Sequence, residues 1–256
     1  MSLLEVSHLA KAFGGVQAVA DVSFQLQSGE MLALIGPNGA GKSTCFNLLN
    51  GQLRPDSGTV TLDGREVTGM RPRGMWWRGV ARTFQVTETF NSMSVRENVQ
   101  TVLLSRARAM LGLWRPADQR FRSEALALLA QVGMAAQAER ICGLLAYGDV
   151  KRVELAMALA SAPSTLLLDE PTAGMGPKER NDLMALIAKL TGERRMGVLF
   201  TEHSMDMVFT YAHRVLVMAR GKLIAQGAPQ SVRDDPQVQA VYLGTGAAYR
   251  PRAGAL

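Results

Sequence analysis

Cysteine is almost missing from this sequence. Only Cys45 and Cys142 occur in 256 residues, and no two cysteines have the spacing of a CxxC motif. This scarcity excludes a disulfide framework and gives no support to a zinc site built from paired cysteines. We therefore interpret both as small buried hydrophobic residues of a protein in a reducing compartment.

Long apolar runs are missing too. The longest are the size of a single strand, and none approaches the roughly 18 residues that a membrane-spanning helix needs. The N-terminus, MSLLEVSHLA, carries Glu5 and His8 within its apolar part and has no basic leader, so we predict no cleavable signal sequence. We expect a cytoplasmic protein, which is still able to dock on a membrane protein.

The composition that remains is that of a globular protein. Apolar residues make up 47% and charged residues 20%, and the length is sufficient for a sizeable core. The net charge of +6 is compatible with nucleic acid, anionic lipid or phosphate ligands and does not choose among them. Basic residues are concentrated in RPRGMWWR (71–78) and between Arg106 and Arg122.

The first third of the chain predicts antiparallel strands. LLEVSHLA and the alternating VSFQLQ read as strands joined by a turn at Gly14 and Gly15, and GTVTLDGREV (58–67) reads as a hairpin around Asp-Gly. A further hairpin is predicted near the end, in RVLVMARGKLIAQG. The tail after about Tyr242 is rich in Gly, Ala and Arg, and we expect it to be loosely ordered.

The centre predicts helices and a parallel sheet. SVRENVQTVLLSRA has Ser94 followed three residues later by Glu97, which is a capping box that opens a helix-rich region. Further on, the apolar runs in STLLLDEP (164–171) and MGVLFTEHS (196–204) flank a helical segment, KERNDLMALIAKL. Strand, helix, strand predicts a parallel sheet with functional groups at the carboxyl ends of its strands.

A phosphate-binding loop follows the apolar run MLALIG. GPNGAGKS (36–43) fits G-x-x-x-x-G-K-[ST] without a mismatch, after a predicted strand and before a predicted helix. Backbone N–H groups of such a loop converge on phosphate oxygens, Lys42 can reach the β- and γ-phosphates, and the Ser43 hydroxyl can hold Mg²⁺. The predicted nucleotide contacts in this segment are Asn38, Gly39, Ala40, Gly41, Lys42, Ser43 and Thr44.

A second motif, LLLDEP, ends a predicted buried strand with two carboxylates. Asp169 is placed to support Mg²⁺, usually through water, and Glu170 to polarise an attacking water as general base. Alone, this motif could equally be a strand end with a solvated acidic turn. Together with the phosphate loop it predicts a nucleoside triphosphate site.

These motifs resemble those of the ATP-binding subunits of ABC transporters, over about residues 3–240. The resemblance implies an α/β fold: a P-loop NTPase with a RecA-like core, an N-terminal antiparallel β subdomain and an inserted α-helical subdomain at about 87–160. It implies a nucleotide-binding domain over 1–242, followed by a tail at 243–256.

The resemblance also implies roles for isolated residues. Phe13 matches the aromatic residue that stacks on adenine, and Val19 is taken as a further nucleotide contact. Gln85, in ARTFQ, matches the glutamine that contacts Mg²⁺ and the attacking water and senses the membrane partner, and His203 matches the histidine that contacts the γ-phosphate. Singly such residues are more often satisfied polar groups, as we interpret His8 and His213; their order around the two strong motifs favours the functional interpretation.

LAYGD (145–149) matches the family signature, typically LSGGQ, which caps the γ-phosphate bound to the other subunit. Its members Ala146, Tyr147, Gly148 and Asp149 are therefore predicted nucleotide contacts. Ala146 removes a hydroxyl, Asp149 adds a charge, and Gly176 stands where a later loop has an aspartate. These departures could indicate a weakened site, but we favour a resemblance to the branched-chain amino-acid importer branch, in which Ala-Tyr, here Ala146 and Tyr147, replaces Ser-Gly and which ARTFQ and DEP-x-AG also resemble. Asp149 and Gly176 remain departures even from that branch.

The resemblance implies an ATPase that uses ATP and Mg²⁺ to drive import of branched-chain or other hydrophobic amino acids, or a related amide- or urea-like solute. Its partners would be separate permease subunits, a second ATPase subunit that is a copy or a paralogue, and indirectly an external solute-binding protein. It would lie on the inner face of the membrane. RPRGMWWR either faces the permease or is a solvated helix.

Two alternatives remain at this point. One is the ATPase of an exporter or envelope-lipid transporter, which would have the same site. The other is a nucleic-acid-linked ABC ATPase. Such proteins usually carry a long coiled-coil insertion or two fused ATPase domains, which this chain lacks, so we predict no nucleic-acid partner.

Overall fold

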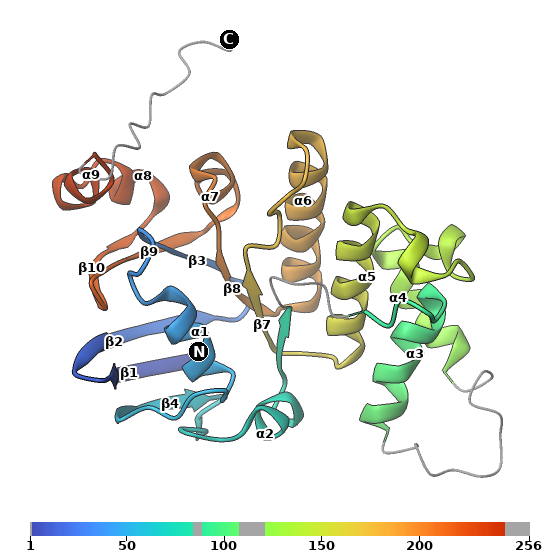
Figure 1. The fold of residues 1–256 in the computed structure, drawn as a ribbon, viewed down its shortest axis with the longest axis horizontal. Helices are drawn as coiled ribbons and strands as arrows, with labels where there is room; N and C mark the ends of the chain where they lie inside the picture. Colours follow the sequence, from blue (N-terminus) through green and yellow to red (C-terminus); the bar gives the residue numbers. More distant parts are fainter. Residues whose placement is uncertain (1, 84–88, 108–120, 244–256) are drawn as a thin grey trace.

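The computed structural model describes residues 2–83, 89–107 and 121–243, and its strands form two sheets (Figure 1). The smaller sheet is antiparallel, in the order β2-β1-β4-β5. Its strands are β1 (Ser2–Phe13), β2 (Val16–Gln27), β4 (Ser57–Leu62) and β5 (Arg65–Glu66). Both predicted hairpins of this region are confirmed, with turns at 14–15 and 63–64.

The larger sheet has the order β10-β9-β3-β8-β7-β6, and only β10 runs antiparallel to its neighbour. Its strands are β3 (Met31–Ile35), β6 (Val80–Thr83), β7 (Thr165–Asp169), β8 (Gly197–Thr201), β9 (Arg214–Ala219) and β10 (Lys222–Gly227). Every residue of β3, β7 and β8 is buried, which explains why these strands read as unbroken apolar runs.

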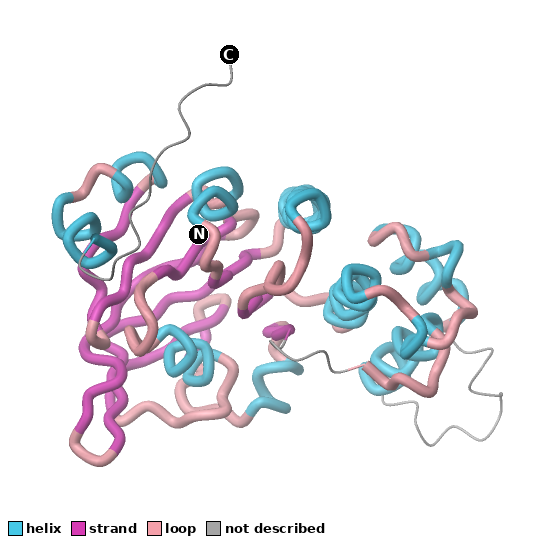
Figure 2. Tube along the Cα trace, turned by 45° about the horizontal axis from the view of Figure 1, so that its top comes forward, coloured by secondary structure: helices cyan, strands magenta, loops and turns pink. Residues whose placement is uncertain are grey.

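The helices are α1 (Lys42–Leu49), α2 (Pro72–Trp77), α3 (Val95–Arg106), α4 (Arg122–Gln131), α5 (Tyr147–Ala160), α6 (Pro177–Arg194), α7 (Met205–Tyr211), α8 (Pro229–Arg233) and α9 (Pro236–Leu243). Helices α3, α4 and α5 contact one another and stand to one side of the sheets, as the turned view in Figure 2 shows. The domain boundaries at about 87, 160 and 242 stay predictions.

The capping box at the start of α3 is confirmed. The Ser94 Oγ atom accepts a hydrogen bond from the Glu97 N–H at 3.2 Å, and the Ser94 N–H donates to Glu97 Oε2 at 2.7 Å. Two donors at the start of the helix are thereby satisfied, which fixes where α3 begins.

Two hydrophobic cores lie on opposite faces of the larger sheet. Leu166 and Leu168 of β7 point into the core with α5 and α6, whereas Leu167 points into the core with α1 and the smaller sheet. The alternation follows from the two-residue period of a strand. Cys45 and Cys142 lie in different cores, both buried and free, as the sequence predicts, and burial raises the pKa of the Cys45 thiol to about 12.

Within the described ranges, no helix has the length and apolar character that crossing a membrane requires.

Candidate functional site

The phosphate loop connects the end of β3 to the first turn of α1, and neighbouring backbone holds it on two sides. A Cβ atom on Gly41 would lie 2.1 Å from the Ala18 carbonyl oxygen of β2, and one on Gly36 would lie 2.2 Å from the Met218 carbonyl oxygen of β9. The Gly221 N–H donates to the Ala40 carbonyl at 3.0 Å. Glycine is needed at positions 36 and 41 because backbone fills the space of a side chain.

Lys42 closes the loop on itself. Its Nζ donates to the carbonyl oxygens of Gly36 at 2.6 Å and Pro37 at 3.1 Å. Burial lowers the pKa of Lys42, while the nearby carboxylates of Glu170 and Asp169 act in the opposite direction. The ammonium is thus already positioned at the loop, where a phosphate would supply stronger, charged acceptors.

A pocket of about 370 Å³ opens over this loop. It is lined by Ala18, Asn38, Gly39, Ala40, Gly41, Lys42, Ser43, Thr44, Asp169, Glu170 and His203. The fold thus brings the whole predicted phosphate segment together with the two carboxylates that follow β7 and the histidine that follows β8. The parallel sheet explains this, because the carboxyl ends of β3, β7 and β8 meet at one edge.

Asp169 is held on both carboxylate oxygens. Thr201 Oγ1 donates to Oδ1 at 2.8 Å, and Arg82 Nη2 donates to Oδ2 at 3.0 Å. Among the described residues, no group of three or more His, Cys, Asp or Glu side chains could hold a metal ion. Ser43 and Asp169 nevertheless line one pocket and offer oxygen, which suits Mg²⁺ when phosphate and water supply the remaining ligands.

Glu170 sits on an unusual backbone. Its φ of 50° lies in the left-handed region, and its N–H points at the Thr201 carbonyl and hydroxyl oxygens, at 3.2 and 3.0 Å. The Glu170 Oε1 atom lies 2.8 Å from Nε2 of His203. The two residues predicted to act at the γ-phosphate are therefore in contact at the pocket.

Glu202, beside this pair, is a carboxylate that the motif reasoning missed. It is buried, and its Oε1 accepts hydrogen bonds from the N–H and hydroxyl groups of Thr172, at 3.0 and 2.7 Å. Burial raises the pKa of Glu202. The contact joins the end of β8 to the segment after Glu170. Its only sequence signal was a glutamate next to His203.

The signature segment, LAYGD at residues 145–149, lies outside the lining of this pocket. Ala146 caps α5, which begins at Tyr147, and the described residues 145–149 contribute nothing to the lining of the phosphate pocket. Tyr147 is 44% exposed. Asp149 Oδ2 accepts a hydrogen bond from Gln137 Nε2 at 3.0 Å, so this departure from the family pattern is used for a contact beside α5.

Besides the signature residues, three further predicted contacts are not seen in the pocket lining. Phe13 is 46% exposed at the end of β1 and does not line the pocket, and Gln85 lies outside the described residues. The Val19 side chain is fully buried in the core, whereas its neighbour Ala18 lines the pocket, because neighbouring strand residues point to opposite faces.

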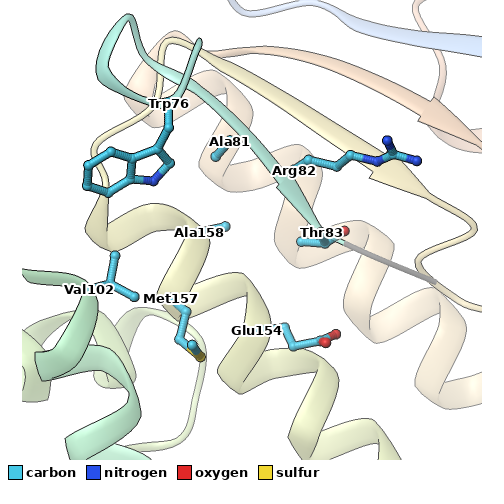
Figure 3. A pocket seen from close by; sticks show the side chains of 8 residues that line it. All are labelled: Trp76, Ala81, Arg82, Thr83, Val102, Glu154, Met157 and Ala158. Carbon is cyan, nitrogen blue, oxygen red and sulfur yellow. The ribbon is translucent and has the colours of Figure 1, made fainter. Parts of the chain in front are cut away.

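A second pocket, of about 290 Å³, lies between α2, β6, α3 and α5 (Figure 3). It is lined by Trp76, Ala81, Arg82, Thr83, Val102, Glu154, Met157 and Ala158. We refer to it as the groove. It joins part of the basic-aromatic stretch 71–78 to the group of helices.

Comparisons with known proteins all identify similar ATP-binding proteins of ABC transporters. The family model described as ABC transporter matches residues 19–173, and the model described as branched-chain amino acid ATP-binding cassette transporter matches residues 222–248. The chain is 40% identical over 252 residues to the high-affinity branched-chain amino acid transport ATP-binding protein BraF of Pseudomonas aeruginosa, covering 94% of this chain and 98% of that protein.

A more distant relative is the lipopolysaccharide export system ATP-binding protein LptB of Haemophilus influenzae. It is 34% identical over 244 residues, covering 95% of this chain and 98% of that protein. Among solved structures, an ATP-binding cassette of an ABC transporter in its ADP conformation superimposes with a TM-score of 0.85 and 29% identity, covering 95% of this chain and 99% of that one.

Proposed function

This chain belongs to the family of ABC transporter ATP-binding proteins, and from that premise we propose that it is the ATP-hydrolysing subunit of an importer for branched-chain or other hydrophobic amino acids. The family and the cassette neighbours confirm the predicted α/β P-loop NTPase fold. The observation that carries the ATPase assignment is the pocket that joins the phosphate loop to Asp169, Glu170 and His203.

The residues of the pocket divide the chemistry among them. Backbone N–H groups of the loop and the start of α1 bind the phosphates, and Lys42 donates to the β- and γ-phosphate oxygens. Ser43 and Asp169 would hold Mg²⁺, which supplies positive charge beside the phosphates. Glu170 takes a proton from the attacking water, and His203 orients Glu170 and contacts the γ-phosphate.

The solute class rests on relatives and on the carboxyl-terminal segment. BraF, named for branched-chain amino acid transport, is more similar to this chain than LptB, and residues 222–248 match a branched-chain amino acid model as well. These observations support an amino-acid importer over a lipopolysaccharide exporter. No observation here favours a nucleic-acid-linked ATPase.

The geometry supports two kinds of partner. Ala146 and Tyr147 of the signature segment are exposed, and the segment does not line this chain's own pocket, which supports a second ATP-binding subunit, a copy or a paralogue, whose phosphate it would cap. The groove, apolar on one side through Trp76, Val102 and Met157, supports docking of a permease helix. The protein would then lie on the inner face of the membrane, and the solute-binding protein would act through the permease.

Uptake tests this function most directly. In cells deleted for the gene, we expect the wild-type chain to restore uptake of labelled leucine, isoleucine or valine. The Lys42→Ala variant, made at equal abundance, should not restore it because it loses phosphate affinity. If uptake of urea or a short amide is restored without leucine uptake, the transported solute is an amide- or urea-like compound and not a branched-chain amino acid. Normal uptake with Lys42→Ala would contradict an ATP-driven role.

Permease docking has its own test. Trp76→Ala removes a large part of the groove wall, whereas the neighbouring Trp77 does not line the groove and serves as the matched control. We expect Trp76→Ala to weaken co-purification with the permease subunits while nucleotide binding is kept. Equal recovery of permease with both variants would contradict docking in the groove.

A further inference from the structure

Arg82 lies on β6, between the groove and the phosphate pocket. Ala81 and Thr83, its neighbours on the strand, line the groove, and Val80 packs in the core with Phe46 of α1. The close view shows the guanidinium of Arg82 pointing away from Trp76 and Met157 (Figure 3). Arg82 also contributes to the groove lining, but the alternation of β6 directs its guanidinium toward α1 and β7.

The guanidinium is fixed by several contacts. Its Nη2 donates to Asp169 Oδ2 at 3.0 Å, and its Nη1 donates to Asn47 Oδ1 at 2.6 Å and to Gln52 Oε1 at 3.1 Å. The Arg82 side chain is 9% exposed and the Asp169 side chain 11%. A permanent cation is thus held against the carboxylate that the proposed function assigns to Mg²⁺.

We propose that Arg82 is the counter-ion of Asp169 in the metal-free protein and that it lowers the affinity of the nucleotide site for Mg²⁺. This inference rests on the proposed function, because it takes Asp169 as the magnesium carboxylate. A guanidinium keeps its charge at every physiological pH, so it opposes an incoming dication whenever it stays in place. The low exposure of both side chains limits screening by salt.

The geometry also argues against a role limited to orienting Asp169. The Thr201 hydroxyl already holds Oδ1, so the carboxylate keeps one anchor when Arg82 is lost. What disappears with Arg82 is mainly its positive charge. A nearly buried carboxylate without that charge is poorly compensated, and the metal ion then becomes its best available partner.

The test measures Mg²⁺ binding rather than turnover. A fluorescent, non-hydrolysable ATP analogue is bound to the full chain, and Mg²⁺ is titrated in from an EDTA-treated start. We expect Arg82→Gln to lower the Mg²⁺ concentration at half-saturation about fivefold or more, because a nearby opposing charge is removed. Arg82→Met, which keeps the aliphatic length, provides a second neutral variant should Arg82→Gln fail to fold.

Two controls separate charge from shape. Arg82→Lys keeps the charge without the forked donor geometry and should stay within about twofold of the wild type. Arg65→Gln removes an exposed arginine from β5 and should change nothing. An unchanged or raised half-saturation concentration in both neutral variants would overturn the inference. If the wild type fails to bind the analogue at all, the proposed function fails instead.

Discussion

The phosphate loop and the signature segment both present glycine at the start of a helix, yet the two glycines face very different surroundings. A Cβ atom on Gly41 would lie 2.1 Å from backbone of the same chain, and Gly41 has a φ of 102°. One on Gly148 would lie 3.4 Å from Met175 Cε and 3.5 Å from the Glu179 carboxyl group, which are ordinary contacts. The first glycine is needed by this chain's own fold, whereas the second is not.

On the proposed function, the difference indicates how an ATP site would be divided between two subunits. Within one chain, strand ends that meet at one sheet edge hold the loop and the carboxylates of the pocket. The signature side is anchored by Asp149 to Gln137 and exposes Tyr147. A methyl group on its glycine would make only ordinary contacts with Met175 and Glu179, so this chain's own fold does not require glycine there, which fits a role toward a second subunit.

The largest effect is expected on the phosphate side. Glu170→Gln keeps the shape of the side chain but removes the base, so turnover should fall by roughly 10²- to 10⁴-fold while ATP affinity is kept. Phosphate release and equilibrium ATP binding measure the two quantities separately. Near-normal hydrolysis in this variant would show that Glu170 is not the general base. The phosphate side would then lack an identified base.

An alanine at each glycine tests the comparison itself. Gly41→Ala should cost about 2–4 kcal/mol of folding free energy and abolish ATP binding, because the methyl group meets backbone in a strained conformation. Gly148→Ala should stay within about 1 kcal/mol of the wild type, since alanine favours the helix. Thermal unfolding and ATP binding of the isolated chain check both.

The second part of the glycine test uses the assembled transporter, in which two ATP-binding subunits are paired. If the signature caps the partner's phosphate as proposed, Gly148→Ala should slow hydrolysis in the assembled transporter even though the isolated chain still binds ATP, because the added methyl group reduces the close backbone approach that glycine allows. If the assembled transporter with Gly148→Ala hydrolyses ATP normally, the signature segment does not approach phosphate closely. An isolated Gly148→Ala chain without ATP affinity would show that the two regions are not independent.

The smallest effect is expected at Ala146. Ala146→Ser introduces an oxygen at the N-cap of α5, which should raise stability by about 0.5–2 kcal/mol. Turnover of the assembled transporter should change by no more than about threefold, because backbone donors remain. Steady-state phosphate release and thermal unfolding distinguish the two effects. A tenfold gain in turnover would show that the missing hydroxyl limits the site.

Much of the fold could be predicted because its signals are local. The strands that are buried on both faces, the hairpin turns and the Ser94–Glu97 capping box each depend on residues close together in the chain, and each is confirmed. Strand β6 was not predicted, since four residues reading VART show no clear period. It forms because β7 offers it a partner.

The site likewise has features that local sequence predicts and features that depend on distant parts of the chain. The phosphate loop and LLLDEP carry their chemistry in contiguous residues, and the pocket lining includes residues 38–44 together with Asp169 and Glu170. That Ala18 lines the pocket while Val19 is buried could not be predicted, because a motif alignment does not reveal which face of β2 is buried. Arg82, Thr201 and Glu202 escaped notice since their partners lie tens of residues away, on neighbouring strands or loops.

The sequence by itself determined the chemistry of this protein: a phosphate loop, two carboxylates at a strand end and a signature before a helix. These follow from residue types at short spacing. Only the tertiary structure decided the surroundings of each group: that Arg82 faces Asp169, that Asp149 faces Gln137, and that the signature stands apart from its own chain's phosphate pocket. Such pairings depend on which strands and helices become neighbours, and the free energy of packing sets that across the whole chain.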